Sequence, residues 1–570
     1  MFLKILIVAI FVAVTVAVGV FARKHSNSVD GFVLGGRNVG PWLSAFAFGT
    51  SYFSAVVFIG YAGQFGWKYG MSVFWVGIGN AVIGSLLAWW VLGPRTREMT
   101  QRLKATTMPE FFGKRYNSRA LRIAAAAIIF VFLIPYTASV YNGLSRLFGM
   151  AFGLPYEWCV IGMAVVTCIY VVLGGYVASV WNDFIQGTIM LIGIIAVIFA
   201  VLNGQGGIAT AIVNLSQIPA EGSAMAGPFT SMFGPDALNL LGVIILTSLG
   251  TWALPQMVQK FYAIKTGPAI KQGAIISTIF ALVVAGGSYF LGGFGRLFGG
   301  DIAYAANGTP IYDSIVPTML AGLPDILLGI VVVLVLSASM STLAGLVLTS
   351  SSTLTLDLIK GNIVKKMSEK KQVRYMRFFI VVFVAISAGI ALVQYHSTIV
   401  FIAQLMGYSW GALSGSFLGP FFWGLFSGRI SKPAVWCSFA LGVGMTVTNM
   451  IFGYIASPIN CGAITMVLSL ILVPIVSFFT KPVPFVVKLL RQQVLSTANM
   501  SMVLRNRRSS TNSRSFVLRV RQKVQFRKNR LKQQPKCEKS AWELAGRFFG
   551  SFAGEEVFFC VHVREAMGFC

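Results

Sequence analysis

A short run of hydroxyl-bearing residues is the part of this sequence best suited to bind an ion. Residues 336–344 read Leu-Ser-Ala-Ser-Met-Ser-Thr-Leu-Ala within an apolar segment. Ser337 and Ser341 are four residues apart and would share a helix face, and Ser341 and Thr342 are adjacent. Because hydroxyl and carbonyl oxygens suit hard cations, the pattern favours a monovalent-cation site. The alternative is that each hydroxyl bonds the carbonyl four residues earlier in its own helix.

Two other apolar segments contain residues that interrupt helices. The segment at about 42–65 has a Gly-Thr-Ser run beginning at Gly49, and the segment at about 236–257 has a Gly-Thr pair at Gly250 followed by Pro255. In a bilayer, unwound backbone is tolerated only where it lines a cavity or is buried in protein. Interruptions at matching places in two halves of a chain indicate a transporter site. Tight helix packing is the alternative explanation for the glycines.

Asp183 is the main ionisable residue expected within an apolar segment, at the start of about 182–202. Such residues are costly in a membrane and usually functional, although the helix dipole also favours a carboxylate at a helix start. We expect no other ionisable side chain at mid-depth, which argues against a proton relay, a metal centre and an enzyme. The seven cysteines show no metal-binding spacing. No cofactor is expected.

The elements that must position these residues are membrane helices. Of the 570 residues, 56% are hydrophobic and only 11% are charged, whereas soluble domains are about 25% charged. A membrane-spanning helix needs about 20 mostly apolar residues. Thirteen segments qualify: about 2–22, 42–65, 71–92, 119–149, 156–173, 182–202, 236–257, 273–296, 323–352, 378–394, 397–425, 434–454 and 462–480.

The basic residues orient these spans. The formal net charge is +28, and Lys and Arg concentrate in cytoplasmic loops of membrane proteins. With the N-terminus outside, twenty-three of them fall in cytoplasmic loops, and the outer side holds only Lys4, Lys68, Arg146 and Arg296. This predicts a cytoplasmic C-terminus in a plasma-membrane protein. Many of the other basic residues lie in a tail, 481–570, which we expect to be disordered or aberrant, so nucleic acid is not an expected partner.

Several motifs in this order resemble those of the sodium:solute symporters, the family of proline, pantothenate, sialic acid and sugar symporters. The resemblance covers about residues 1–480 and implies an all-α, LeuT-type fold of 5+5 inverted repeats, at about 42–202 and 236–425, with an extra leading helix. The motifs are Phe32-Val-Leu-Gly-Gly-Arg37, Thr107-Met-Pro-Glu-Phe-Phe-Gly-Lys-Arg115, Leu173-Gly-Gly-Tyr176, Trp181-Asn-Asp183, Pro255-Gln-Met-Val-Gln-Lys260 and Ser339-Met-Ser-Thr342.

The resemblance also implies site residues. The sodium ligands would come from Thr50, Phe53, Ala338, Ser341 and Thr342. The candidates for contact with the solute are Ser51, Tyr52, Ser54, Gln64, Thr251 and Gln404. Asp183 and Pro255 would act in gating or ion release.

Departures from the family pattern refine the expected activity. Ala344 and Gly345 stand where some members carry hydroxyls of a second sodium site, so we expect one sodium ion. Proline symporters carry an aspartate where Tyr52 stands and aromatics at Thr247 and Thr251, which argues against proline. We therefore expect sodium-coupled import of a small organic solute, such as an amino acid or carboxylate, by alternating access. The alternative is a sodium-independent facilitator or channel on the same fold.

Overall fold

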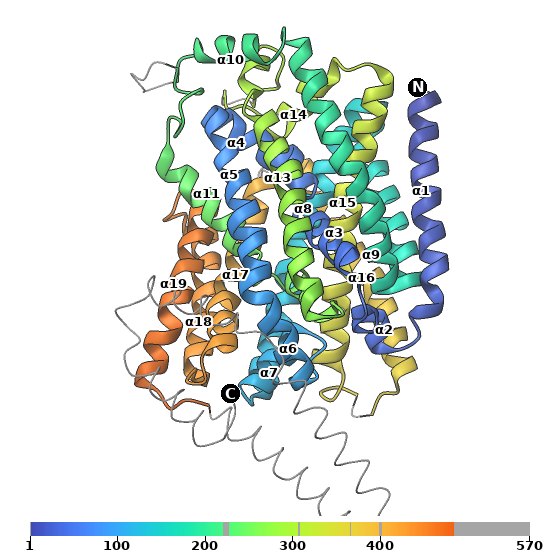
Figure 1. The fold of residues 1–570 in the computed structure, drawn as a ribbon, viewed down its shortest axis with the longest axis vertical. Helices are drawn as coiled ribbons and strands as arrows, with labels where there is room; N and C mark the ends of the chain where they lie inside the picture. The colour runs from blue at the N-terminus through green and yellow to red at the C-terminus, as the bar shows by residue number, and fades with distance from the viewer. Residues whose placement is uncertain (1, 221–226, 306–307, 365, 398–401, 484–570) are drawn as a thin grey trace, which may run out of the picture. The chain divides into compact units, whose positions relative to one another are not determined.

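The computed structural model describes residues 2–220, 227–305, 308–364, 366–397 and 402–483. The chain divides into two units, Met1–Phe485 and Val486–Cys570. The expected tail, 481–570, lies outside the described residues from residue 484 onward. The described residues are all-α: they contain no named strand, only isolated β-bridges (Figure 1). The expected fold class is confirmed.

The first half of the helical unit runs from a leading helix to a helix in the 203–235 connection. Its elements are α1 (Phe2–Ala22), η1 (Arg23–His25), α2 (Val29–Leu34), η2 (Gly35–Arg37), α3 (Pro41–Tyr52), η3 (Val56–Tyr61), α4 (Ala62–Tyr69), η4 (Gly70–Val73), α5 (Phe74–Gly79), η5 (Asn80–Leu92), α6 (Gly93–Leu103), α7 (Met108–Arg115), α8 (Arg119–Phe152), α9 (Tyr156–Gly204) and α10 (Ile208–Ser216).

The second half begins with another interrupted helix. Its elements are α11 (Ala237–Gly250), α12 (Pro255–Ala263), α13 (Gly267–Gly292), η6 (Gly295–Phe298), α14 (Tyr312–Ala321), α15 (Asp325–Thr353), η7 (Leu354–Ile359), α16 (Glu369–Ser397), α17 (Ile402–Phe426), α18 (Lys432–Phe452) and α19 (Pro458–Phe479).

The helical passes agree with the thirteen expected spans. Ten described stretches are long and apolar enough to cross a membrane. Two of them, Val56–Leu103 and Tyr156–Gly204, have 48 and 49 residues, more than twice the length that one crossing needs. Each turns at a glycine with positive φ, Gly70 (φ 61°) or Gly175 (φ 56°), a conformation that residues with a side chain rarely adopt. Counting these two as double passes and adding α17 gives thirteen.

Many helices begin where the sequence supplies a capping side chain. Each capping oxygen accepts a hydrogen bond from the backbone N–H three residues later, and so satisfies one of the unpaired donors of the first turn. The capping residues are Ser28, Thr107, Ser118, Asp236, Thr266, Ser431 and Ser457. Polar side chains thus fix where the apolar helices start.

Helix α15 lies at the centre of the packing (Figure 1). Its most apolar window is 83% buried, whereas that of α1 is 22% buried. It contacts α9, α8, α1, α16 and α3. The helix that carries the hydroxyl run is therefore surrounded by protein, and its polar groups must find partners inside the fold.

The close approach of α4 and α13 depends on two glycines. A Cβ placed on Gly66 would lie 1.9 Å from the carbonyl oxygen of Gly292, and a Cβ on Gly292 would lie 2.2 Å from that of Ala62. Backbone atoms cannot retreat as a flexible side chain does, so the two helices would have to separate.

We predict that Gly66→Ala lowers the melting temperature of the detergent-solubilised protein. The added methyl overpacks the contact at a cost of about 1–3 kcal/mol, more than the helix propensity that alanine gains. Gly162→Ala is the matched control, because nothing lies within 4 Å of the added carbon there. Equal melting temperatures for Gly66→Ala and wild type would contradict the predicted clash.

Candidate functional site

The interruption of α3 leaves backbone carbonyls without helical partners. Helix α3 ends at Tyr52, and Phe53 donates its N–H to the Gly49 carbonyl, 3.0 Å away. A new helical segment, η3, begins at Val56, whose N–H bonds the Ser54 hydroxyl at 3.2 Å. The last carbonyls of α3 therefore need other partners. The expected interruption of the 42–65 segment is present.

One of these carbonyls, that of Thr50, faces the adjacent hydroxyls of α15. The Ser341 Oγ lies 3.1 Å and the Thr342 Oγ1 3.2 Å from the Thr50 oxygen. The same hydroxyls lie 3.2 and 3.1 Å from the carbonyl oxygen of Ala338. Two carbonyls and two hydroxyls thus form a compact group of four oxygens, which we call the oxygen cluster. All four residues are buried.

The oxygen cluster has more acceptors than protons. Its two hydroxyls carry one proton each, and the Ser341 hydroxyl also lies 2.9 Å from the Ser337 carbonyl. Bonding within α15 was the alternative to ion binding, and such bonds occur here together with the contacts to the Thr50 carbonyl of α3. Oxygens around an ion bound at about 2.3–2.6 Å, the range for Ca²⁺, would lie roughly 3.3–3.7 Å apart. The cluster would need to expand by only a few tenths of an ångström to fit a cation of that size.

The structure thus brings together four of the five residues named as sodium ligands. The fifth, Phe53, lies directly after the end of α3 and is buried, with its ring stacked on Tyr52 at a centroid distance of 4.2 Å. It lies in the same interruption as Thr50.

The solute candidates near the interruption fall into two groups. Tyr52 and Thr251 use their hydroxyls to bond backbone carbonyls, at 2.6 Å to Thr247 and 2.9 Å to Gly84. Ser54 caps η3. Ser51 differs, because its buried hydroxyl has no hydrogen-bond partner among the described residues. Of these four candidates, Ser51 has the free capacity to bind a solute.

Gln256 is a residue that the sequence analysis did not select. Its side-chain amide is buried and has no hydrogen-bond partner in the described part of the chain. Both its Cβ and the Ser51 hydroxyl lie within 4 Å of the position that a Cβ on Gly345 would take. Gly345 is one helical turn beyond Ser341, so two unpaired polar groups lie beside the oxygen cluster. The signal in the sequence was a glutamine inside a mostly apolar stretch.

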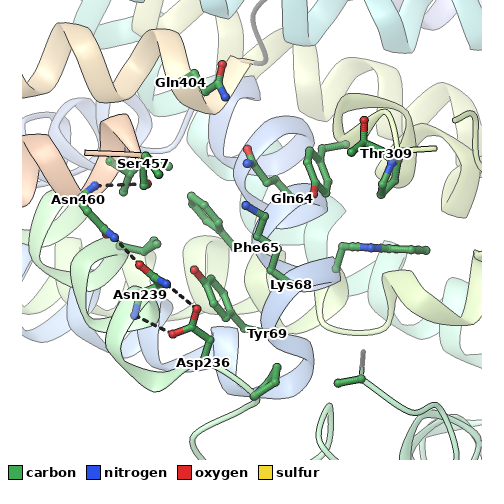
Figure 2. A pocket seen from close by; sticks show the side chains of 18 of the residues that line it. Gln64, Phe65, Lys68, Tyr69, Asp236, Asn239, Thr309, Gln404, Ser457 and Asn460 are labelled. Carbon is green, nitrogen blue, oxygen red and sulfur yellow. Dashed lines mark hydrogen bonds between the residues drawn. The ribbon is translucent and has the colours of Figure 1, made fainter. Parts of the chain in front are cut away.

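The remaining candidates, Gln64 and Gln404, line a cavity at one end of the helical unit (Figure 2). The cavity has a volume of about 920 Å³ and is bordered by α4, α11, α14, α17 and α19. We call it the vestibule. The six solute candidates therefore do not form one pocket. Two line the vestibule, Ser51, Tyr52 and Ser54 lie at the interruption of α3, and Thr251 lies directly after α11.

The second interruption lies between α11 and α12. Helix α11 ends at Gly250 and α12 begins at Pro255, as the sequence indicated. The Gly250 carbonyl accepts a hydrogen bond from the Ser414 hydroxyl at 2.8 Å. Pro255 occupies the first turn of α12, where its missing N–H costs nothing. Its place directly after the break suits a hinge.

Asp183 lies beside a lysine that the sequence analysis had assigned to a cytoplasmic loop. Lys260 is in α12, and its Nζ lies 3.6 Å from the Asp183 Oδ2 and 5.2 Å from the centre of the Tyr176 ring. Both charged residues are buried. Asp183 also lies two turns beyond the bend at Gly175 in α9, not in a first helical turn. The assignment of Lys260 to an exposed loop was therefore wrong: it lies buried in α12.

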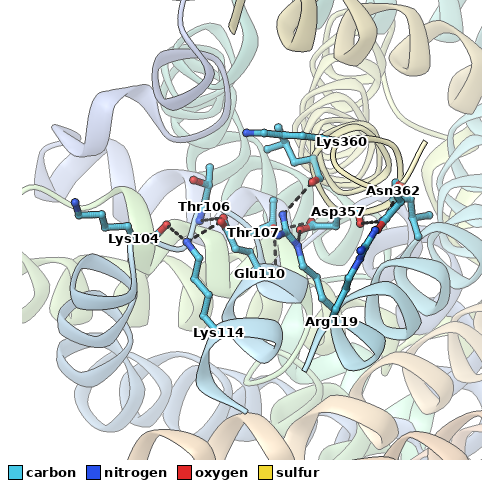
Figure 3. Close-up of polar contacts among 12 residues, drawn as sticks. Lys104, Thr106, Thr107, Glu110, Lys114, Arg119, Asp357, Lys360 and Asn362 are labelled. Carbon is cyan, nitrogen blue, oxygen red and sulfur yellow. Dashed lines mark hydrogen bonds and ion pairs between the residues drawn. The ribbon is translucent and has the colours of Figure 1, made fainter. Parts of the chain in front are cut away.

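A second polar network joins the end of α15 to α7 and α8 (Figure 3). Asp357 in η7 accepts a hydrogen bond from the Thr107 hydroxyl at 2.6 Å and pairs with the Arg122 Nε at 2.6 Å. Arg119 donates to the Gly361 carbonyl at 2.8 Å, and the Asn362 amide donates to the Asp357 carbonyl at 2.9 Å. We call these residues the α15 anchor. It holds the far end of the helix that carries Ser341.

These features are those of a class of protein: multi-pass membrane transporters with buried polar groups at helix interruptions. The comparisons agree. The model of the sodium:solute symporter family matches residues 32–442, so the chain belongs to the sodium:solute symporter family. It is a sodium-coupled symporter of a small solute and not an enzyme.

Individual relatives match most of the chain's length, and one solved structure has a similar fold. The chain is 27% identical over 419 residues to the osmoregulated proline transporter OpuE of Bacillus subtilis (strain 168), covering 73% of this chain and 82% of that protein. It is 28% identical over 418 residues to the sodium/proline symporter of Salmonella typhimurium, covering 71% and 79%. A Na⁺-coupled sialic acid symporter solved in a substrate-bound, outward-open state matches with a TM-score of 0.65 at 17% identity, covering 85% of this chain and 99% of that one.

We predict that Lys260→Met lowers thermal stability strongly, because it leaves the Asp183 carboxylate buried without its cation. Removing one partner of a buried pair costs about 3–5 kcal/mol. The double variant Lys260→Met with Asp183→Asn should recover most of the loss, since no uncompensated charge remains. Melting of the solubilised protein measures both effects.

Arg102→Met is the control for this prediction, because Arg102 pairs with Glu98 where both side chains are about 60% exposed. Exposed pairs contribute little to stability. If the Lys260 variant melts like the Arg102 variant, the buried pair does not stabilise the fold.

Proposed function

We propose that the oxygen cluster is the sodium site and that one sodium ion drives solute import by alternating access. The observation that carries the proposal is that the unpaired Thr50 carbonyl meets Ser341 and Thr342 across the interruption of α3. The ligands would be the carbonyls of Thr50, Phe53 and Ala338 and the hydroxyls of Ser341 and Thr342. Lys260 supports a single-ion cycle, because its ammonium already balances the Asp183 carboxylate.

The position of the cluster explains how sodium would be coupled to the solute. An ion there bridges α3 and α15, so its binding holds the interrupted segment of α3 against α15. The unpaired groups of Ser51 and Gln256 lie beside the same segment. A solute bound to them would therefore meet a correctly positioned α3 only when sodium is present. Coupling then arises because the two ligands share one mobile segment.

We propose that the solute is a small organic molecule of the amino acid or carboxylate class. The named relatives transport proline, and the structural match is a sialic acid symporter; both compounds carry a carboxylate. Helix ends at the two interruptions offer backbone groups for such an anion. Tyr52 and Thr251 are already bonded to backbone, so they shape the site and leave Ser51 and Gln256 to contact the solute.

We predict that Ser341→Ala with Thr342→Ala abolishes the sodium dependence of solute uptake. The test uses proteoliposomes with an inward sodium gradient and a labelled panel of proline, sialic acid, pantothenate and sugars. Losing two hydroxyl ligands, each worth about 1.5–3 kcal/mol, should raise the half-maximal sodium concentration by tenfold or more. Unchanged sodium dependence in the double variant would rule out this site.

Ser339→Ala is the matched control, because the Ser339 hydroxyl bonds only the Val335 carbonyl of its own helix, at 2.7 Å. It should keep normal sodium dependence. Accumulation above equilibrium separates a symporter from a facilitator on the same fold: wild-type protein should concentrate the solute only when the sodium gradient is present.

We also propose that the N-terminus lies outside and the C-terminus in the cytoplasm of the plasma membrane, as the loop charges indicate. We predict that a green fluorescent protein fused after Cys570 fluoresces in a bacterial host, whereas alkaline phosphatase fused there is inactive. An active phosphatase and a dark fluorescent fusion would reverse the orientation.

A further inference from the structure

The vestibule is lined by more positive than negative side chains, and the proposed sodium site does not account for them. It lies at the end of the helical unit where α11, α14 and α19 begin (Figures 1 and 2). Its volume of about 920 Å³ is at the upper end of the range for small-molecule sites, about 300–1,000 Å³. Its lining includes Lys68, Arg296 and Asp236, so the balance of lining charges is positive.

Lys68 is the lining cation with free hydrogen-bonding capacity. It lies in the last turn of α4, and its Nζ stands 5.3 Å from the centre of the Tyr312 ring. No carboxylate of the described residues forms an ion pair with it. An ammonium group can donate three hydrogen bonds, so this side chain is equipped to receive an anion from the vestibule.

The other cations on the same expected side of the membrane are held by the fold. Lys4 pairs with Asp325 at 2.8 Å, and Arg146 lies 3.8 Å from the Asp313 carboxylate. Arg296 donates to the Trp67 carbonyl at 2.8 Å and stacks on the Trp67 ring. These three have structural explanations, whereas Lys68 projects into a cavity.

The carboxylate in the lining, Asp236, is already engaged. It caps α11: its Oδ1 accepts from the Asn239 backbone N–H at 3.1 Å, and its Oδ2 accepts from the Asn239 amide at 2.5 Å (Figure 2). Its oxygens are therefore occupied by the first turn of α11, although its charge also acts on Lys68 across the vestibule. The positive ends of α11 and α19, the latter capped by Ser457, border the same space and also favour an anion.

Gln64 connects this charge with the interior of the protein. It lies one helical turn before Lys68 on α4, so the two side chains share a helix face. Gln64 is only 4% exposed, and its Oε1 has no hydrogen-bond partner among the described residues. The Gln64 amide and the Lys68 ammonium therefore form a short polar path along one wall of the vestibule.

We propose that the vestibule is an entry site for solutes that carry a carboxylate, with Lys68 as the group that attracts and selects the anion. The proposal rests on the symporter function and narrows its substrate to carboxylates. The carboxylate would contact the Lys68 ammonium first and the N–H donors of the Gln64 amide next. Partly exposed charges interact weakly, so the site would raise the local solute concentration without trapping the solute.

A labelling experiment tests the proposal without depending on transport. Ala456 is small, exposed and part of the lining, so Ala456→Cys reports on the vestibule. Two methanethiosulfonate reagents are compared: the anionic sulfonatoethyl and the cationic trimethylammonioethyl compound. Labelling of protein without Ala456→Cys is subtracted to correct for the native thiols. We expect the anionic reagent to be favoured, and Lys68→Gln to lower the anionic-to-cationic rate ratio about two- to fivefold, the size of one partly exposed charge.

Two further variants and a pair of competitors complete the test. Lys68→Arg should keep the wild-type ratio, and Lys271→Gln, at an exposed lysine of α13 outside the lining, should not change it. Propionate should slow the labelling of Ala456→Cys more than propionamide does, and this difference should disappear in Lys68→Gln. An unchanged ratio in Lys68→Gln, or equal protection by the two competitors, would overturn the proposal.

The two proposals fail in different measurements. Labelling needs no sodium gradient, so a negative labelling result leaves sodium-driven uptake intact. Loss of sodium-driven uptake, in turn, does not change the reactivity of a cysteine in the vestibule.

Discussion

The unpaired backbone at the interruption of α3 is the constraint on which the rest of the structure depends. A membrane protein cannot leave a buried carbonyl unsatisfied without a cost of several kcal/mol. Here the Thr50 carbonyl is satisfied by hydroxyls of a different helix, Ser341 and Thr342. The break in α3 therefore requires a polar α15 beside it, and a polar α15 requires burial at the centre of the bundle. The ion site, the central helix and the packing around it follow from one local departure from helical geometry.

Helix α15 connects that site to the end of the molecule opposite the vestibule. The α15 anchor fixes its last residues through Asp357, Arg122 and Thr107, and Thr349 donates to the Gln259 amide of α12 at 3.0 Å. Backbone pairing between Val39 and Lys265 at 3.0 Å links the segments that precede α3 and follow α12. The two interrupted helices are thus tied to each other and to α15 at one end, while at the other end their flanking helices border an open cavity.

The sequence was most informative where a residue's role depends on its immediate neighbours. Apolar runs, glycines and a proline identified the thirteen passes and both interruptions, because helix formation in a membrane is governed by local chain chemistry. The spacing of the hydroxyls also pointed to Ser341 and Thr342, whereas Thr50 and Ala338, which join them in the cluster, were named from the resemblance to the family. The solute candidates separated into two places, because nothing local distinguishes Gln64, in the vestibule wall, from Ser51, beside α15.

The residues that were assigned wrongly or not selected depend on contacts between distant segments. Lys260 was counted as a loop cation because the apolar run ends near it, and only the tertiary fold, in which α12 packs against α3 and α6, brings it to Asp183, 77 positions earlier in the chain. Counting charges in loops uses every basic residue to assign a side of the membrane. It does not show which residues are buried, and a buried charge needs a partner because water does not screen it.

The two ends of the helical unit differ in the free energy that opening would cost in the proposed cycle. Opening the end that holds the α15 anchor means separating charge-assisted hydrogen bonds, each worth about 1.5–3 kcal/mol, and any one of them left unmade stays buried and costly. The vestibule side has an open cavity with an exposed lysine, Lys68, in its wall, so it needs no such separation to admit a solute. Ligand binding must therefore contribute most of its free energy to opening the anchored end. An ion that bridges α3 and α15 is well placed to do so, because α15 itself carries the anchor.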